Sequence, residues 1–265
     1  MRQAMIFAAG MGTRLKPLTD RMPKALVPVG GHPLLDIVIS RLLATGIYDR
    51  FVINVHHFAQ QIIDYLHEND NFGLDIRISD ETSGLLETGG GIRKALPLFD
   101  PSGPILIHNV DILSNVDLSL GDCPLCEQRS ELQGDCPLCE KGNPDALLLV
   151  SRRQTKRYLL FDDEMILDGW TNIETGEVRS PYQGLDPTDC KQLAFSGIHV
   201  LWPRVFPLLE QMPERFGIID FYLKYCHQCA FLGYEQKDLR LLDVGKLDTL
   251  EQANVFIETN SHNLP

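Results

Sequence analysis

Glycines and cations are concentrated in one stretch near the N-terminus, AAGMGTRLKPLTDRMPK at residues 8–24. Two glycines come first and four cations follow: Gly10, Gly12, Arg14, Lys16, Arg21 and Lys24. The whole chain, by contrast, carries a formal net charge of -12 at pH 7. A glycine turn exposes backbone N–H groups to phosphate oxygens, and neighbouring cations favour their charge. The stretch therefore predicts a local pocket for a small anionic ligand.

Two common phosphate-binding patterns do not fit this stretch. The dinucleotide fingerprint G-x-G-x-x-G needs a glycine where Leu15 stands, because a larger side chain there crowds the helix against the strand. The phosphate loop G-x-x-x-x-G-K-[ST] is absent, since Gly245-Lys246 has neither the upstream glycine nor the following hydroxyl. What remains is G-x-G-T-R, followed after a short interval by Lys24.

Acidic residues follow a predicted strand in the middle of the chain and end another near the C-terminus. Asn109 and Asp111 come directly after the apolar run 104–108, and Asp243 lies in the run 239–244. Ligands of open parallel sheets bind at the carboxyl ends of the strands, so acids there are well placed for chemistry. A role in capping a loop fits Asp111 equally well.

The apolar pattern predicts elements that would bring these residues together. Strand and helix alternate in the first third of the chain, with strands at 4–9, 51–55 and 74–78 and helices at 33–44 and 58–66. Further predicted elements are strands at 104–108, 146–151, 195–201 and 239–244, a hairpin at 158–166, and helices at 221–232 and 248–258. The alternation favours a layered α/β fold with a mostly parallel sheet. We expect a single domain over residues 1–265, with a cysteine-rich insert at 119–143.

The composition excludes several classes of protein. Hydrophobic residues make up 44% of the chain and charged residues 23%, which is typical of a globular protein with a sizeable core. The apolar runs are too short to span a bilayer and the N-terminus lacks a signal pattern, so we expect a cytoplasmic protein without a membrane partner. The excess of acid argues against a nucleic-acid partner, which needs a basic face. The sequence does not indicate the oligomeric state.

The stretch Gly10–Lys24 resembles the signature of the sugar-phosphate nucleotidyltransferases, which join a nucleoside triphosphate to a sugar 1-phosphate and release pyrophosphate. Five further stretches fall in the order that this family uses: 52–66, 86–99, 108–113, 194–201 and 241–254. The short LETGGG form is most similar to that of the bacterial N-acetylmuramic acid 1-phosphate uridylyltransferases of cell-wall recycling. The mannose 1-phosphate guanylyltransferases are the next most similar group. The resemblance implies a Rossmann-like (GT-A-like) layered α/β fold, with a mixed, mostly parallel central sheet flanked by helices.

The same resemblance implies roles for individual residues. Arg14 would stabilise the departing pyrophosphate, Lys24 would bridge the reacting phosphates, and Asp111 and Asp243 would hold one catalytic Mg²⁺. The nucleotide would contact Ala8, Ala9, Gly10, Met11, Gly12, Thr13, Glu87, Thr88, Gly89, Gly90 and Asn109. Ser196 and Gly197 are candidates for the sugar side, with a plain bulged strand as the alternative. Lys16 and Arg21 are expected on a solvated face of the loop.

One residue departs from the family pattern, and the residues that would identify the sugar are not found. Lys246 stands where the family commonly has threonine, which brings an extra cation near the expected metal. No pair of an acid and a lysine that would specify the sugar is found in 168–190. Guanylyl transfer to mannose 1-phosphate and cytidylyl transfer to phosphocholine therefore stay as alternatives, and so does a non-catalytic nucleotide sensor or a zinc-linked binding protein.

The remaining chemical motif is a doubled heptad, GDCPLCE at 121–127 and 134–140. Two C-x-x-C pairs at short spacing are typical of a tetrahedral zinc site, here Cys123, Cys126, Cys136 and Cys139. The alternative is a set of reduced thiols on a loop. A third pair, Cys226 and Cys229, lies in an apolar run and is expected to pack in the core.

Overall fold

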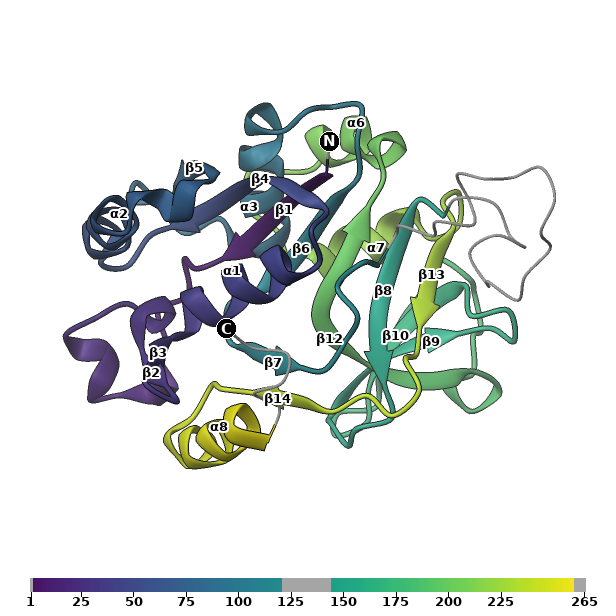
Figure 1. The fold of residues 1–265 in the computed structure, drawn as a ribbon. Coiled ribbons are helices and arrows are strands. Elements are labelled where there is room, and N and C mark those ends of the chain that lie inside the picture. The colour runs from purple at the N-terminus through teal and green to yellow at the C-terminus, as the bar shows by residue number, and fades with distance from the viewer. Residues whose placement is uncertain (1, 121–143, 260–265) are drawn as a thin grey trace, which may run out of the picture.

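A ten-stranded mixed sheet forms the centre of the protein in a computed structural model that describes residues 2–120 and 144–259 (Figure 1). The strands are β1 (Arg2–Phe7), β4 (Tyr48–Val55), β5 (Asp75–Asp80), β6 (Ile105–Asn109), β8 (Ala146–Ser151), β9 (Arg157–Phe161), β10 (Leu167–Asn172), β11 (Glu177–Arg179), β12 (Lys191–Leu201) and β13 (Phe231–Tyr234). Eight of them follow the order β11-β10-β9-β12-β6-β1-β4-β5, while β8 pairs with β12 and β13. The predicted α/β fold with a mixed sheet is confirmed. The expectation that the sheet is mostly parallel is wrong, because four pairings of this sheet are parallel and five are antiparallel among the described residues.

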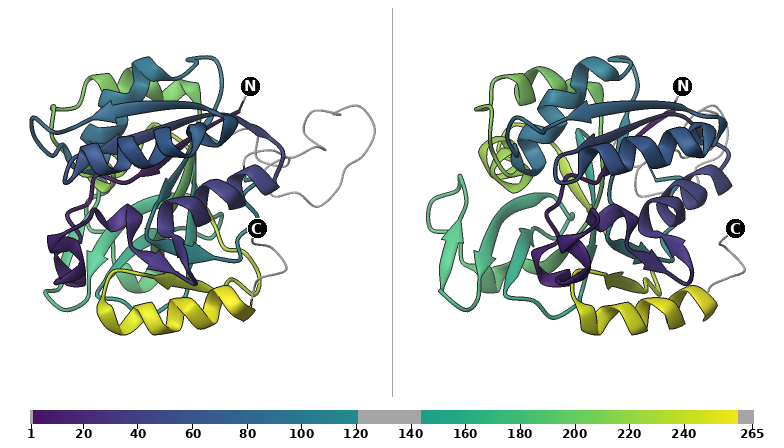
Figure 2. Two further views of the ribbon diagram at one scale, coloured as in Figure 1. Left: turned by 60° about the vertical axis from the view of Figure 1, so that its left-hand side comes forward. Right: turned by 90° about the vertical axis from the view of Figure 1, so that its left-hand side faces the viewer.

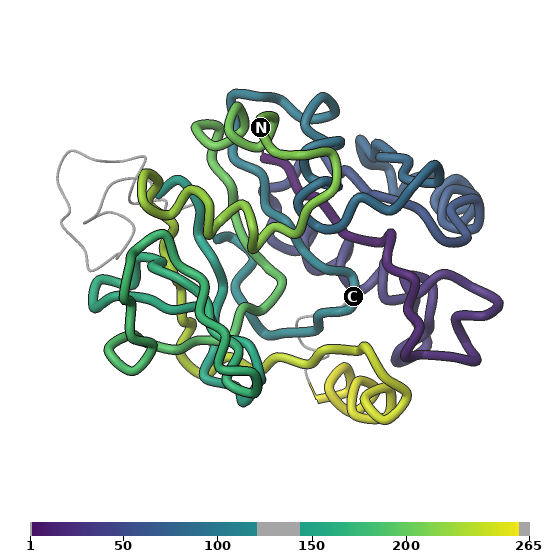
Figure 3. Tube along the Cα trace, turned by 180° about the vertical axis from the view of Figure 1, so that it is seen from behind, coloured from purple at the N-terminus to yellow at the C-terminus, as the bar shows by residue number. Residues whose placement is uncertain are grey.

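Helices cover both faces of this sheet. They are α1 (Leu34–Ala44), α2 (Ala59–Glu68), α3 (Glu87–Ala95), α6 (Phe206–Glu210), α7 (Ile218–Tyr225) and α8 (Leu247–Thr259). Figure 1 shows α1 in front of the sheet, and Figure 3, seen from behind, shows the green segment with α6 and α7 on the other side. Two small sheets complete the fold: β2 (Pro28–Val29) with β3 (His32–Pro33), and β7 (Ile112–Ser114) with β14 (Leu241–Asp243).

Alternate residues of the central strands enter two separate cores. In β1, Ala4 and Ile6 pack into the core beneath α1 and α2, whereas Met5 packs into the core beneath α3 and α7. Successive side chains of a strand point to opposite faces, so a central strand must be apolar at every position. Each fully buried aliphatic side chain contributes about 1.5–3 kcal/mol relative to its exposed state. The unbroken apolar run of β1 is thus explained by burial on both sides.

Parallel pairing brings three strand ends to one edge of the sheet. Strand β1 pairs with β4 on one side and with β6 on the other, both in parallel. The last residue of β1, Phe7, lies opposite Asn54 of β4 and Asn109 of β6. The glycine turn that follows β1 and the acidic segment that follows β6 are therefore neighbours, as the sequence predicted.

The chain returns to this edge through its C-terminal part. Strand β14 runs antiparallel to β7, and α8 lies along the bottom of the molecule, below this two-stranded sheet (Figure 2). The side-chain oxygen of Asn254 in α8 accepts a hydrogen bond of 2.7 Å from the N–H of Gly30 in the β2–β3 turn. The C-terminal helix is thus attached to the N-terminal part of the chain.

One predicted element is wrong in part. The helix expected over 221–232 is α7, which ends at Tyr225, and Phe231–Tyr234 form the strand β13. Strand β13 pairs in parallel with β8, from Phe231 opposite Ala146 to Tyr234 opposite Leu149. A short apolar run fits a helix and a buried strand equally well, and the free edge of β8 decides between them.

Two further predictions concern membrane-spanning helices and the cysteine-rich insert. Among the helices that the structure describes, none combines the length and the apolar character that a membrane crossing requires. The insert expected at 119–143 lies almost entirely outside the described residues, so the single domain with an insert stays a prediction.

Candidate active site

The glycine turn after β1 has a shape that depends on Gly12. This residue adopts a φ of +61°, a conformation that side chains other than glycine rarely adopt, and its carbonyl oxygen accepts a hydrogen bond of 2.8 Å from Oγ1 of Thr19. A Cβ atom on Gly12 would lie 2.8 Å from Cγ2 of Thr19 and 3.1 Å from Cβ of Lys24. The glycine therefore permits the side chains of Thr19 and Lys24 to approach the turn closely.

A cavity of about 480 Å³ opens at this edge of the sheet. The predicted residues that line it are Ala8, Ala9, Gly10, Met11, Gly12, Thr13, Arg14, Lys24, Glu87, Thr88, Asn109 and Asp111. Backbone N–H groups of a turn and the cations Arg14 and Lys24 thus share one hollow with the acids Glu81, Glu87 and Asp111. The N–H groups and the cations are what the binding of a polyphosphate requires. Lys16, in contrast, pairs with Asp20 at 2.9 Å on the exposed side of the loop, as expected for a solvated residue.

Lys24 and Asp111 form an ion pair inside the cavity. Nζ of Lys24 donates a hydrogen bond to Oδ2 of Asp111, and the side chains are only 9% and 20% exposed. An ammonium group that is largely removed from water needs such a partner, because an unpaired buried charge is costly. The cation and the acid that the sequence placed far apart are therefore in direct contact.

Asp243 reaches the same region from the other strand of the small sheet. Asp243 lies opposite Ile112, the residue after Asp111, and the N–H of Val244 donates a hydrogen bond of 2.8 Å to the carbonyl oxygen of Asp111. Asp111, which directly precedes β7, thus lies close in the backbone to Asp243, the last residue of β14. Their carboxylates are hard oxygen donors of the kind that Mg²⁺ prefers, so the residues fit such an ion.

The guanidinium group of Arg14 lies close to Gly245, as does the carboxylate of Asp243. Nη2 of Arg14 and Oδ1 of Asp243 both lie 2.7 Å from the point where a Cβ atom of Gly245 would stand, so they are at most twice that distance apart. Asp243 does not line the first cavity but an adjoining one, of about 750 Å³, which shares Arg14 and Gly245 with it. All four residues predicted to be catalytic are thus gathered around the boundary of two cavities.

Sequence reasoning missed two residues that hold the turn in place. Oδ1 of Asn54 accepts hydrogen bonds of 2.7 Å and 3.3 Å from the N–H groups of Ala8 and Ala9, and Nδ2 of Asn54 donates to Oε1 of Glu81 at 2.7 Å. Glu81 is fully buried, and its other oxygen accepts a bond of 3.1 Å from the N–H of Leu86. The only signal in the sequence is a polar residue inside the apolar strand FVINV.

The glycines after Glu87 serve packing rather than the cavity. Gly89 and Gly90 lie inside α3, and both N–H groups donate to the carbonyl oxygen of Phe216 at 2.9 Å and 3.1 Å. A Cβ atom on Gly89 would lie 2.2 Å from the ring of Phe216, so a side chain there is excluded. Neither glycine lines the cavity, although Glu87 and Thr88 do. The contact with the nucleotide that the sequence predicts for these glycines stays a prediction.

Ser196 and Gly197 lie in β12 and line neither of the two cavities. Gly197 has a φ of +74°, and a Cβ atom there would lie 2.5 Å from Nδ2 of Asn109, so the glycine makes room for the asparagine of the first cavity. The register of β12 against β8 shifts between Phe195 and His199. This is the bulged strand that the sequence left open as the alternative.

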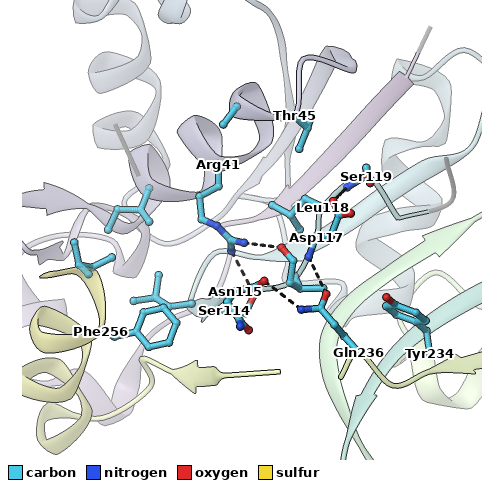
Figure 4. Close-up of a pocket in the computed structure, with 15 residues that line it drawn as sticks. Arg41, Thr45, Ser114, Asn115, Asp117, Leu118, Ser119, Tyr234, Gln236 and Phe256 are labelled. Carbon is cyan, nitrogen blue, oxygen red and sulfur yellow. Dashed lines mark hydrogen bonds between the residues drawn. The ribbon is translucent and has the colours of Figure 1, made fainter. Parts of the chain in front are cut away.

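A third cavity, of about 630 Å³, lies at the far end of β7 and contains none of the predicted residues (Figure 4). Its wall is held by Arg41, whose guanidinium donates to the carbonyl oxygen of Val116 at 2.8 Å and to Oγ of Ser114 at 3.3 Å. Burial lowers the pKa of Arg41 to about 10. Through its two hydrogen bonds, Arg41 anchors Ser114 and Val116, in the segment that follows Asp111.

The cysteines divide into two groups. Cys123, Cys126, Cys136 and Cys139, the predicted zinc ligands, lie outside the described residues, and that site stays a prediction. Cys226 and Cys229 are buried in the core beneath α7, as expected. Within residues 2–120 and 144–259, no three histidine, cysteine, aspartate or glutamate side chains gather as a metal site.

Comparison with known proteins shows which family the first part of the chain resembles. Residues 3–120 match the nucleotidyl transferase family. Over 110 residues the chain is 46% identical to an N-acetylmuramate alpha-1-phosphate uridylyltransferase of Caulobacter vibrioides, covering 41% of this chain and 45% of that protein. An enzyme of the same description from Neisseria meningitidis is 43% identical over 117 residues, covering 44% and 50%. The chain thus spans about half the length of the curated relatives it matches.

The fold agrees over nearly the whole chain. The crystal structure of HddC from Yersinia pseudotuberculosis complexed with GMP-PN has a TM-score of 0.68 to this chain at 19% identity, and the alignment covers 97% of this chain and 100% of that one. At this identity the likeness concerns the fold alone. The resemblance seen in the sequence is confirmed for part of the chain: residues 3–120 match the nucleotidyl transferase family.

Proposed function

We propose that the protein transfers a uridylyl group from UTP to N-acetylmuramate 1-phosphate and releases pyrophosphate. The nucleotidyl transfer itself is supported by the family of residues 3–120 and by the grouping of turn, cations and acids in one place. The choice of base and sugar is supported by two relatives that carry this description.

In this reaction an oxygen of the acceptor's phosphate forms a bond to the α-phosphorus of the triphosphate. The bond from that phosphorus to the bridging oxygen of pyrophosphate breaks, and the electron pair leaves with pyrophosphate. Catalysis is therefore a matter of positioning and of neutralising charge. The N–H groups of the Gly10–Thr13 turn would bind the triphosphate, Arg14 would neutralise the leaving group, and Lys24 would hold the reacting phosphates.

Asp111 and Asp243 would hold Mg²⁺, which when bound neutralises phosphate charge. The structure supports this assignment through the hydrogen bond from Val244 N–H to the carbonyl oxygen of Asp111, which ties the two acidic positions together. This convergence of Arg14, Lys24 and two acids is the single observation that carries the proposal. A protein that only binds a nucleotide would not need all four groups.

The cleanest test is Asp243→Asn, because Asp243 is exposed and its charge is not the partner of Lys24. We expect kcat for pyrophosphate release to fall by at least about 100-fold, with the thermal unfolding temperature unchanged. Asp163→Asn is the control, since this exposed carboxylate contacts only Lys191, at 3.8 Å. Normal turnover by Asp243→Asn would refute the role of the acid pair.

Base and acceptor are tested separately. The protein is incubated with UTP, GTP or CTP and with N-acetylmuramate 1-phosphate, mannose 1-phosphate or phosphocholine, and pyrophosphate is measured. Among these combinations, the proposal predicts release only with UTP and N-acetylmuramate 1-phosphate. Release with GTP and mannose 1-phosphate, or with CTP and phosphocholine, would replace the substrates while keeping the reaction. Tight nucleotide binding without any release would indicate a sensor.

A further inference from the structure

The cavity that adjoins the candidate active site is strongly basic. Its charged lining consists of five cations and two acids: Arg14, Arg153, Lys156, Arg157 and Lys246, with Asp243 and Asp248. The chain as a whole carries a formal net charge of -12, so this local excess of positive charge is unusual for the molecule. Cations lining one hollow repel one another and raise the local concentration of anions.

Of these five cations, Lys156 alone has an acidic partner in the described part of the chain, and two others, Arg157 and Lys246, are neither assigned to the leaving group, as Arg14 is, nor bonded to a carbonyl oxygen, as Arg153 is. Lys156 is paired with Glu174 at 2.7 Å, and Arg153 donates a hydrogen bond of 3.0 Å to the carbonyl oxygen of Phe195. Arg157 and Lys246, by contrast, form no ion pair within residues 2–120 and 144–259, and both are exposed. They are thus the groups that remain available for an anion in the cavity.

The position of the cavity indicates which anion it receives. On one side it shares Arg14 and Gly245 with the cavity of the glycine turn, and Asp243 stands at this boundary. On the other side Arg153 is fixed to Phe195, the residue before Ser196 and Gly197. The cavity therefore extends from the place of the reacting phosphates toward β12, where the acceptor side was expected.

We infer that this cavity binds the acceptor and that Arg157 and Lys246 recognise a second acidic group on it, a carboxylate separate from the phosphate. The inference rests on the proposed function and assigns the residues that would determine acceptor specificity. N-acetylmuramate 1-phosphate carries such a carboxylate on its lactyl ether, whereas N-acetylglucosamine 1-phosphate is the same sugar phosphate without it. A charge-assisted hydrogen bond from either cation to the carboxylate favours the first acceptor over the second.

The test is the ratio of kcat/KM for these two acceptors, measured with UTP in the wild-type protein and in Arg157→Gln and Lys246→Gln. Each substitution is expected to lower kcat/KM for N-acetylmuramate 1-phosphate by about tenfold, which corresponds to about 1.4 kcal/mol, mainly through KM. Turnover of N-acetylglucosamine 1-phosphate should stay within about twofold. Arg152→Gln is the matched control, because this neighbouring arginine pairs with Glu235 at 2.8 Å and does not line the cavity.

A merely structural role would lower turnover of both acceptors equally, and that result would overturn the inference. So would an unchanged ratio, or a loss of inhibition by pyrophosphate without a change in the ratio, which would assign the cavity to the leaving group. If neither acceptor is turned over, the proposed function fails, and calorimetric binding of the two sugar phosphates then decides the inference. A preference for the carboxylated acceptor that Arg157→Gln abolishes supports it, whereas equal or absent binding overturns it.

Discussion

Asn54 connects Glu81 to the glycine turn: its amide donates to the buried carboxylate at 2.7 Å while its carbonyl oxygen accepts the N–H of Ala8 at the same distance. The pair fixes the backbone at the point where β1 ends and the turn begins. The candidate active site therefore depends on a buried polar contact that touches no predicted catalytic group.

Replacement of this asparagine should reduce both stability and activity. In Asn54→Ala the carboxylate of Glu81 and the N–H groups of Ala8 and Ala9 lose their partner, and a buried polar group without a partner costs about 1–3 kcal/mol. We expect the free energy of unfolding in urea to fall by that amount, and the KM for the nucleotide to rise. Asn69→Ala, which removes an exposed amide bonded to Tyr65, should change neither. Equal losses in both variants would contradict the assigned role.

Gly12 is expected to be the sensitive glycine of the turn. Gly12→Ala places a methyl group 2.8 Å from Cγ2 of Thr19 and imposes a left-handed conformation on alanine, which costs about 1–2 kcal/mol for the backbone alone. Gly10→Ala is the matched control for stability, since a Cβ atom there meets nothing within 4 Å. Thermal unfolding should therefore separate the two variants, and similar melting temperatures would show that the turn tolerates the change.

The ion pair of Lys24 and Asp111 should behave as a unit. Asp111→Asn alone leaves the ammonium group of Lys24 largely buried without an anionic partner, which we expect to lower the free energy of unfolding by about 3 kcal/mol. The double variant Lys24→Met with Asp111→Asn removes both charges and should recover most of this loss. Urea unfolding of the single and double variants measures the coupling. Additive effects would mean that the pair contributes nothing to the fold.

The buried ring of His199 should make the stability of the fold depend on pH. Burial lowers the pKa of His199 to about 3, and its Nδ1 is hydrogen-bonded to the hydroxyl of Tyr222. The folded state keeps the ring neutral while the unfolded state takes up a proton below about pH 6.5, so stability is complete above that pH and is lost as the pH falls toward about 3. His108, fully buried with a pKa of about 3, acts in the same direction.

In His199→Gln the dependence should weaken. Between about pH 6 and 4.5, the free energy of unfolding should decrease less steeply as the pH falls than it does in the wild type. The two slopes should differ by about 1.4 kcal/mol per pH unit, because the variant lacks one group that takes up a proton on unfolding. His67→Gln, on the exposed side of α2, should leave the slope unchanged. A slope that is the same in all three proteins would show that His199 is protonated in the folded state.

The first half of the fold could be predicted because its pattern is simple. The apolar run of β1, the helical spacing of α1 and the strand β4 follow in an order that allows few arrangements, and parallel pairing then fixes which ends meet. The run around Phe231 could not be assigned, because only the edge of β8 decides that it is a strand. Strand β7 is three residues long and carries no periodic signal at all.

The candidate site was predictable where chemistry is concentrated in short motifs. Arg14, Lys24 and Asp111 line one cavity as expected. Glu81 gave no such signal, because a buried carboxylate is recognised only once its partner from another strand is known. The glycines of α3 show a second limit: the small size of Gly89 makes room for the ring of Phe216, a residue distant in sequence, which the motif alone does not reveal.

The small sheet of β7 and β14 has a consequence for the newly synthesised chain. The turn, Lys24 and Asp111 leave the ribosome long before Asp243, which arrives only with β14. A nascent chain that stops before Leu241 can build the parallel strands around the turn but lacks one of the two acids. Catalytic competence would therefore be acquired late in translation, when the final strand docks beside β7.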